Sequence, residues 1–152
     1  MAWKGEVHQV SRGGEATYHG PGQVVVYPII NLKRRECDIG RLLRGIESSL
    51  ISTLKNWNVE SEPAGTTPTG VWVDGKKVAS IGIAVRRWVT YHGLALNLYA
   101  DDLAFQGITP CGFPSSTMIS LEEILGKKVA RKEFEDVLCD ELVKIFTTKP
   151  NL

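Results

Sequence analysis

The stretch Val71-Trp-Val-Asp-Gly-Lys-Lys-Val-Ala-Ser-Ile-Gly-Ile-Ala-Val85 predicts a β-hairpin. Its β-prone arms, residues 71–73 and 78–85, flank Asp74-Gly75, a dipeptide typical of a two-residue hairpin turn. Residues 88–99 follow and are rich in β-branched, aromatic and apolar side chains. Strands are therefore expected to dominate the middle of the chain.

Helical patterns lie on both sides of this region. Apolar residues recur at helical spacing after Asp38, an N-cap type, for about four to five turns. Ser120-Leu-Glu-Glu123 has the capping-box pattern of a short helix that Gly126 can end, and an amphipathic pattern follows from Phe134. This mixture of strands and helices predicts an α+β fold.

Length and charge narrow the functional classes. A chain of 152 residues with 43% hydrophobic content is expected to form a single domain, residues 1–152. The net charge of +1 gives no general basic field, so we expect no nucleic-acid partner and no membrane partner. The longest apolar run, residues 24–30, is far shorter than a membrane span, and the N-terminus lacks a signal-peptide pattern.

The three cysteines show no disulfide or zinc spacing, which favours a reducing compartment and a cytoplasmic location. Cys111 lies in Thr-Pro-Cys-Gly, where proline and glycine predict an exposed turn suited to a reactive thiol. The alternative is a small buried hydrophobic residue, and that interpretation is kept for Cys37 and Cys139.

Two further residue types attract attention. Lys77 enters a small, apolar strand that could desolvate its amine and lower its pKa, although such a lysine can also be a solvated strand end. His19 and His92 each precede a glycine and could be held beside a ligand-covering loop, or could simply be hydrogen-bonded in turns. Neither GxGxxG nor GxxxxGK[ST] is present, so a nucleotide-binding interpretation is weak.

The chain contains five separated motifs: Arg12-Gly-Gly-Glu-Ala-Thr-Tyr-His-Gly-Pro-Gly-Gln23, Gly70-Val-Trp, Lys77-Val-Ala-Ser-Ile-Gly82, His92-Gly-Leu-Ala-Leu-Asn97 and Pro110-Cys-Gly112. In this order they resemble the lipoyl(octanoyl) transferase family. The resemblance implies a mixed β-sheet packed with helices, like that of the biotinyl and lipoyl protein ligases. Because only eleven residues precede Arg12, we expect the family's usual N-terminal segment to be missing from this chain.

Site residues follow from the same resemblance. It implies that Cys111 is the acyl-accepting nucleophile and that Lys77 lowers the pKa of this thiol and shuttles protons. The implied substrate-binding residues lie in three of the motifs: Arg12, Gly13, Gly14, Glu15, Ala16, Thr17, Tyr18, His19, Ser80, Ile81, Gly82, His92, Gly93, Leu94 and Ala95.

The implied reaction is the first step of protein lipoylation. An octanoyl group passes from octanoyl-acyl carrier protein through a cysteine thioester to a lysine of lipoyl domains, those of 2-oxoacid dehydrogenases and of the glycine cleavage H protein. No ATP, metal or organic cofactor is expected. We expect an apolar tunnel from residues such as Val78, Ile81, Leu94 and Leu96. Candidate docking residues for acidic partners are basic: Lys33, Arg34, Arg35, Arg86 and Arg87, although such runs are often merely solvated.

Two other functions remain open. An ATP-dependent lipoate ligase of the same superfamily would consume ATP with free octanoate and would need no nucleophilic cysteine, so Cys111 paired with Lys77 argues against it. A non-catalytic acyl-binding relic, or an inactive fragment, would form no covalent adduct, and the short N-terminus is the feature that favours it.

Overall fold

The computed structural model describes residues 5–12, 16–35, 38–65, 69–101, 105 and 107–147. One five-stranded sheet forms the centre, in the order β1-β5-β4-β3-β2, and every pair of neighbouring strands is antiparallel. The strands are β1 (Gln23–Val26), β2 (Glu62–Pro63), β3 (Gly70–Val73), β4 (Lys76–Arg86) and β5 (Val89–Asn97). The predicted α+β class is confirmed. The parallel component expected of a mixed sheet is limited, within the described residues, to a single bridge between Lys77 and Met118.

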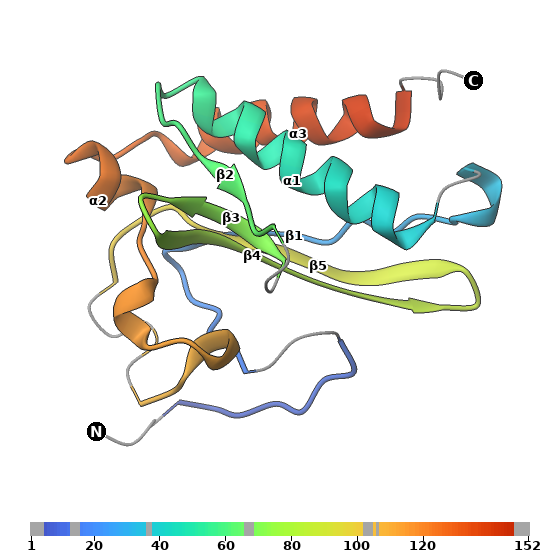
Figure 1. The fold of residues 1–152 in the computed structure, drawn as a ribbon, viewed down its shortest axis with the longest axis horizontal. Helices are drawn as coiled ribbons and strands as arrows, with labels where there is room; N and C mark the ends of the chain where they lie inside the picture. Colours follow the sequence, from blue (N-terminus) through green and yellow to red (C-terminus); the bar gives the residue numbers. More distant parts are fainter. Residues whose placement is uncertain are drawn as a thin grey trace.

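Two long helices cover one face of this sheet (Figure 1). They are α1 (Ile39–Lys55) and α3 (Arg131–Thr147), and the short α2 (Leu121–Leu125) precedes α3. The N-terminal segment and the segment between β5 and α2 lie on the opposite side of the sheet (Figure 1). The sheet therefore has a helix-covered face and a loop-covered face.

The helix boundaries follow the predicted caps. The Asp38 side chain accepts a hydrogen bond from the Arg41 backbone at 2.8 Å, which satisfies one free N–H of the first turn of α1. Ser120 and Glu123 form the reciprocal capping box of α2, and Gly126 ends that helix in the left-handed conformation. No helix in the described part of the chain is both long and apolar enough to cross a bilayer.

The core lies between the helices and their face of the sheet. Its fully buried members from the helices repeat at helical spacing: Leu42, Ile46, Leu50 and Leu54 of α1, with Phe134 and Leu138 of α3. One expectation was wrong: Cys139 of α3 is exposed and is not a small core residue. It directly follows Leu138, so the helical rotation turns it away from the core. Cys37 is outside the described residues.

The β3–β4 and β4–β5 hairpins have two-residue turns with positive φ. Asp74 and Gly75 adopt φ values of 48° and 75°, as the Asp-Gly dipeptide predicts. Arg87 and Trp88 adopt 51° and 68°, although neither is a residue that favours this conformation. The sequence signal for this second turn is therefore weak, and the strand expected to begin at Trp88 begins at Val89.

Gly93 allows β1 to bend closely across β5. A Cβ added there would lie 1.9 Å from the Val26 carbonyl oxygen and 2.8 Å from Cδ of Pro28. We expect Gly93→Ala to lower the free energy of unfolding by about 3 kcal/mol, because the backbone must shift to relieve the overlap. Chemical denaturation measures this, with the exposed Val85→Ala as the control. An unchanged midpoint for Gly93→Ala would show that this close approach is not a constraint.

Candidate active site

The loop-covered face of the sheet has a floor of small side chains. Residues opposite one another in antiparallel strands share a face, and the register pairs Gly70 with Ser80, Ser80 with Ala95, and Gly82 with Gly93. These five residues cross β3, β4 and β5 on the side away from the helices. Their small size leaves a depression above the sheet.

A β-bulge turns Lys77 toward this floor. Val71 pairs with Ala79 but Trp72 pairs with Lys77, so β4 carries one extra residue between these two pairs. Without it, strict alternation would place Lys77 on the face opposite to that of Ser80, three positions later. The bulge therefore puts Lys77 and Ser80 on the same face.

The Lys77 side chain is almost completely enclosed. It is 1% exposed, and its Nζ lies 5.6 Å from the centroid of the Trp72 ring. A Cβ added at Gly70 would be 2.5 Å from Cε of Lys77, so glycine leaves the room that this side chain occupies. Lys77 is therefore not a solvated strand-end lysine, which was the alternative interpretation of the sequence.

The segment that carries Cys111 runs beside Lys77. Cys111 lies in the 3-10 helix η2 (Pro110–Gly112), and its side chain is outside the described part of the structure. The Phe113 ring packs edge-on against Trp72 with a centroid separation of 5.3 Å. After η3 (Ser115–Thr117), the Ile119 N–H donates to the Lys77 carbonyl at 3.1 Å. Backbone and ring contacts thus hold this segment against the start of β4.

A cavity of about 920 Å³ lies over the small-residue floor. Thirteen of the predicted site residues line it: Arg12, Ala16, Thr17, Tyr18, His19, Lys77, Ser80, Ile81, Gly82, His92, Gly93, Leu94 and Ala95. Gly13, Gly14 and Glu15 are outside the described residues, as is the Cys111 side chain. The fold therefore gathers residues from motifs up to about 80 positions apart around one space.

The lining differs from the sequence expectation in two ways. Val78 and Leu96, expected in an apolar tunnel, pack in the core beneath the sheet and do not line the cavity. Ile81 and Leu94 line the cavity, but their side chains belong to the same core, because they alternate with the small residues of the floor. Sequence reasoning also missed part of the wall: Glu6, Val7, His8, Val10, Tyr27, Leu43, Thr69, Ile83 and Ile108. These residues lack a motif, and only the tertiary fold brings them to the cavity.

Tyr18 is fixed in the cavity wall by polar and aromatic contacts. Its hydroxyl donates to Oδ2 of Asp101 at 2.7 Å, and its ring packs edge-on against Phe105. Burial, assisted by the hydrogen bond to the Asp101 carboxylate, raises the pKa of Tyr18 to about 12. The phenol consequently stays protonated and keeps donating at physiological pH.

A buried amide relay joins the N-terminal motif to the segment beyond Cys111. Nδ1 of His19 lies 3.1 Å from Oε1 of Gln23, whose Nε2 donates to Oδ1 of Asn97 at 2.8 Å. Nδ2 of Asn97 donates to the Ile119 carbonyl at 3.2 Å. The Ile119 N–H also donates to the Lys77 carbonyl, so the relay links His19 to the residue that holds the Lys77 backbone.

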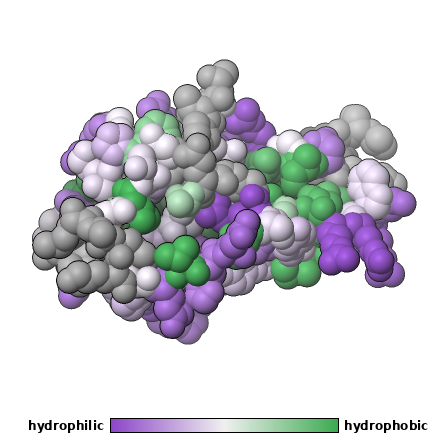
Figure 2. Space-filling model, turned by 90° about the horizontal axis from the view of Figure 1, so that it is seen from below, coloured by the Kyte–Doolittle hydropathy of each residue, from purple (hydrophilic) through white to green (hydrophobic). Residues whose placement is uncertain are grey.

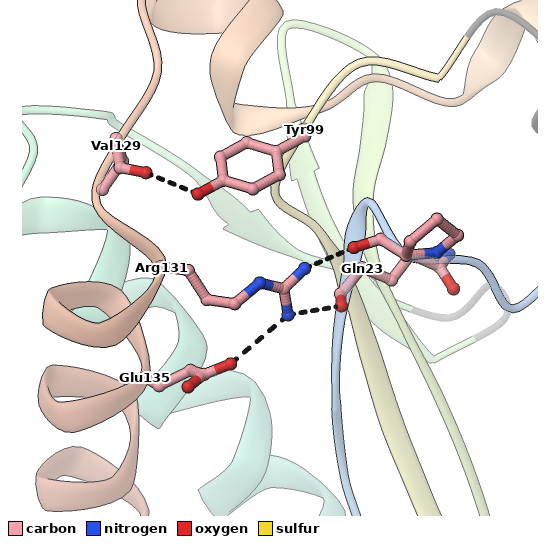
Figure 3. Close-up of polar contacts among 6 residues, drawn as sticks. Gln23, Tyr99, Val129, Arg131 and Glu135 are labelled. Atoms are coloured by element: carbon pink, nitrogen blue, oxygen red, sulfur yellow. Dashed lines mark hydrogen bonds and ion pairs between the residues drawn. The ribbon is translucent and has the colours of Figure 1, made fainter.

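Arg131 of α3 secures the start of this relay (Figure 3). Among the described residues β1 is an edge strand, so the carbonyls on its outer side have no neighbouring strand there. The Arg131 guanidinium donates to the Gln23 carbonyl at 3.0 Å and to the Pro21 carbonyl. It also pairs with Glu135 and lies over the Tyr99 ring, 5.6 Å from its centroid. One side chain from the helix layer thereby fixes the turn that leads into the cavity wall.

Basic and apolar side chains meet at the far end of the β4–β5 hairpin. Residues 27–35 and 83–92 hold five of the 18 basic residues and none of the 17 acidic ones. Nζ of Lys33 lies 5.3 Å from the centroid of the Trp88 ring, which is 53% exposed. Figure 2 shows strongly hydrophilic and hydrophobic side chains beside one another toward this end of the molecule. The hairpin end is therefore a cationic surface with an exposed aromatic ring.

Residues 3–143 match the lipoyl protein ligase A/B catalytic domain. The chain is 42% identical to an octanoyltransferase of Bdellovibrio bacteriovorus, over 95% of this chain and 74% of that protein. It is 45% identical to an octanoyltransferase of a Synechococcus strain, over 93% of this chain and 53% of that protein. The chain belongs to the lipoyl protein ligase A/B catalytic domain family. Within that family it groups with octanoyltransferases, which are acyl-transferring enzymes, so the resemblance found in the motifs is confirmed.

Solved structures agree on the fold. A lipoate-protein ligase A bound with ATP superposes with a TM-score of 0.64 at 17% identity, covering 88% of this chain and 56% of that one. The biotin protein ligase of Aquifex aeolicus gives a TM-score of 0.63 at 17% identity, covering 82% of this chain and 53% of that one. The expected biotinyl and lipoyl protein ligase fold is confirmed, and this chain spans about half the length of each of these structures.

We expect Arg131→Gln to lower the free energy of unfolding by about 2 kcal/mol, because it removes charge-assisted hydrogen bonds from two carbonyls. The neighbouring Lys132→Gln is the matched control, since Lys132 is 80% exposed and pairs only with Asp136 among the described residues. Its substitution should leave the denaturation midpoint nearly unchanged, because exposed ion pairs contribute little to stability. Urea denaturation of both variants measures the difference, and equal losses would contradict the role given to Arg131.

Proposed function

We propose that this chain transfers an octanoyl group from a carrier-protein thioester to a lysine of a lipoyl domain, through a thioester on Cys111. The observation that carries the proposal is a buried lysine, Lys77, held at the cavity beside the segment that contains Cys111. Membership of a family whose relatives are octanoyltransferases supports the same reaction.

In the first step the Cys111 thiolate attacks the carbonyl carbon of the donor thioester. The carbon–sulfur bond to the carrier breaks, and the carrier leaves as a thiol after taking a proton. Lys77 is the group we assign to accept the Cys111 proton and deliver it to the leaving sulfur. The product is an octanoyl thioester on Cys111.

In the second step the lysine amine of the acceptor attacks that thioester. The bond from the carbonyl carbon to Cys111 sulfur breaks, an amide forms, and the proton lost by the amine returns through Lys77 to the cysteine. Burial disfavours the charged form of an amine, which suits Lys77 to a role as proton acceptor. Neither step needs ATP, a metal or an organic cofactor.

The floor of Ser80, Gly82 and Ala95 suits an unbranched acyl chain, because small side chains let the chain lie close to the sheet. Ile81 and Leu94 also line the cavity, with their side chains packed in the core beneath that floor. Each buried methylene contributes about 0.8 kcal/mol, so an eight-carbon chain can supply much of the binding free energy. Arg12 and the residues from Ala16 to His19 are assigned to the opposite wall. Gly13, Gly14 and Glu15 of the same motif stay predicted substrate-binding residues.

The proposed partners are octanoyl-acyl carrier protein as donor and lipoyl domains as acceptors, including those of 2-oxoacid dehydrogenases and the glycine cleavage H protein. The cationic hairpin end, with Lys33, Arg34, Arg86 and Arg87, is a candidate docking surface for an acidic protein. A reactive thiolate persists in a reducing compartment, so we assign the chain to the cytoplasm.

Intact-mass measurement tests the proposal. Incubation with octanoyl-loaded carrier protein should add one octanoyl group, and Cys111→Ala should abolish the adduct while Cys139→Ala keeps it. Lys77→Met should slow adduct formation by roughly 100-fold or more, the scale of general acid–base catalysis. A folded chain that forms no adduct would contradict the proposed function and favour a non-catalytic relic. ATP-dependent modification with free octanoate would instead indicate a ligase.

A further inference from the structure

The amide relay described above has a defined direction, because both of its ends are fixed by backbone groups. The Ile119 carbonyl can only accept, so the Asn97 atom facing it at 3.2 Å is the donor Nδ2. Oδ1 of Asn97 then accepts from Nε2 of Gln23. At the other end, the Gly20 N–H can only donate, and it points to Oε1 of Gln23 at 3.4 Å. The two ends independently require the same orientation of both amides.

This direction determines which nitrogen of His19 carries the proton. Oε1 of Gln23 is an acceptor, and Nδ1 of His19 lies 3.1 Å from it. A neutral histidine has one donor nitrogen and one acceptor nitrogen. Nδ1 must therefore be the N–H donor in the neutral ring, and Nε2 must carry the lone pair.

The ring is placed to use that lone pair. His19 lines the cavity and is exposed, and its hydrogen bond within the described chain is made through Nδ1. Arg131 holds the Gln23 backbone from the helix layer, so the relay is anchored from both sides of the sheet. A hydrogen bond to the ring nitrogen that faces away from the ligand sets the tautomer and orientation of functional histidines in other sites.

We propose that Gln23 and Asn97 are positioning residues that hold His19 as its Nδ1–H tautomer, so that Nε2 accepts a hydrogen bond from a substrate N–H in the cavity. This inference rests on the proposed function, in which the N–H group that must approach the thioester is the attacking amine of the acceptor lysine. His19 then orients the amine, while the proton transfers remain with Lys77. The step involves no covalent change at His19.

The tautomer can be measured without any reaction. In protein labelled with ¹⁵N at histidine, the His19 ring should show a protonated Nδ1 and an unprotonated Nε2 in its neutral form, with resonances assigned through a His19→Gln variant. Gln23→Glu retains an acceptor oxygen and should keep this tautomer. Gln23→Leu removes the acceptor and should lose it, whereas Gln9→Leu, the same change at an exposed position outside the cavity lining, should have no effect. A protonated Nε2 in the unmodified protein would overturn the inference.

The rates of the two half-reactions distinguish a loss of amine orientation from a general disturbance of the site. Gln23→Leu should slow discharge of the octanoyl adduct to a lipoyl domain by roughly tenfold, the equivalent of one lost hydrogen bond. It should leave adduct formation within about twofold, and Gln23→Glu should discharge faster than Gln23→Leu. Equal slowing of both half-reactions, or of neither, would overturn the role of His19. Absence of any adduct in the unmodified protein would contradict both the proposed function and the role of His19 toward the amine. The tautomer measurement would still test whether Gln23 and Asn97 hold His19 as its Nδ1–H tautomer.

Discussion

The burial of Lys77 is the constraint on which the rest of the site depends. A lysine side chain that is 1% exposed needs a structure that accommodates it, because burial of a charge is costly. Three features provide that place: the extra residue in β4 that turns the side chain away from the helices, the missing side chain at Gly70, and the Trp72 ring. Such an arrangement around a buried amine supports the catalytic role proposed for Lys77.

The two faces of the sheet have different roles. The helix-covered face supplies stability through the leucine and isoleucine contacts of α1 and α3, while the loop-covered face holds small residues and a cavity. Arg131 and the Gln23–Asn97 pair connect the two faces. Arg131 of α3 holds the Gln23 backbone, and the Gln23 side-chain amide bonds Asn97 beside the cavity wall. Stability and site geometry are consequently coupled through a few hydrogen bonds.

Sequence patterns predicted the regular elements well, because caps and turns are local. Asp38, Ser120 with Glu123, and Asp74-Gly75 each determine a boundary from within a few residues. The motifs also identified thirteen residues that the fold brings to one cavity. Local patterns could not predict side-chain direction. The bulge in β4 reverses the alternation that would have pointed Lys77 toward the helices. Val78 and Leu96 lie in the core beneath the sheet, and the sequence has no signal that distinguishes the two faces of these strands. Arg131, 108 positions from Gln23, belongs to no motif.

The most direct test of the account is the pH dependence of thiol alkylation, followed site by site by mass spectrometry. If the buried lysine supports a thiolate at Cys111, this cysteine should react with iodoacetamide at neutral pH faster than the exposed Cys139, and Lys77→Met should remove the advantage without changing Cys139. A Cys111 that reacts no faster than Cys139, or whose reactivity is the same in Lys77→Met, would contradict the claim that Lys77 and the Cys111 segment form one catalytic unit.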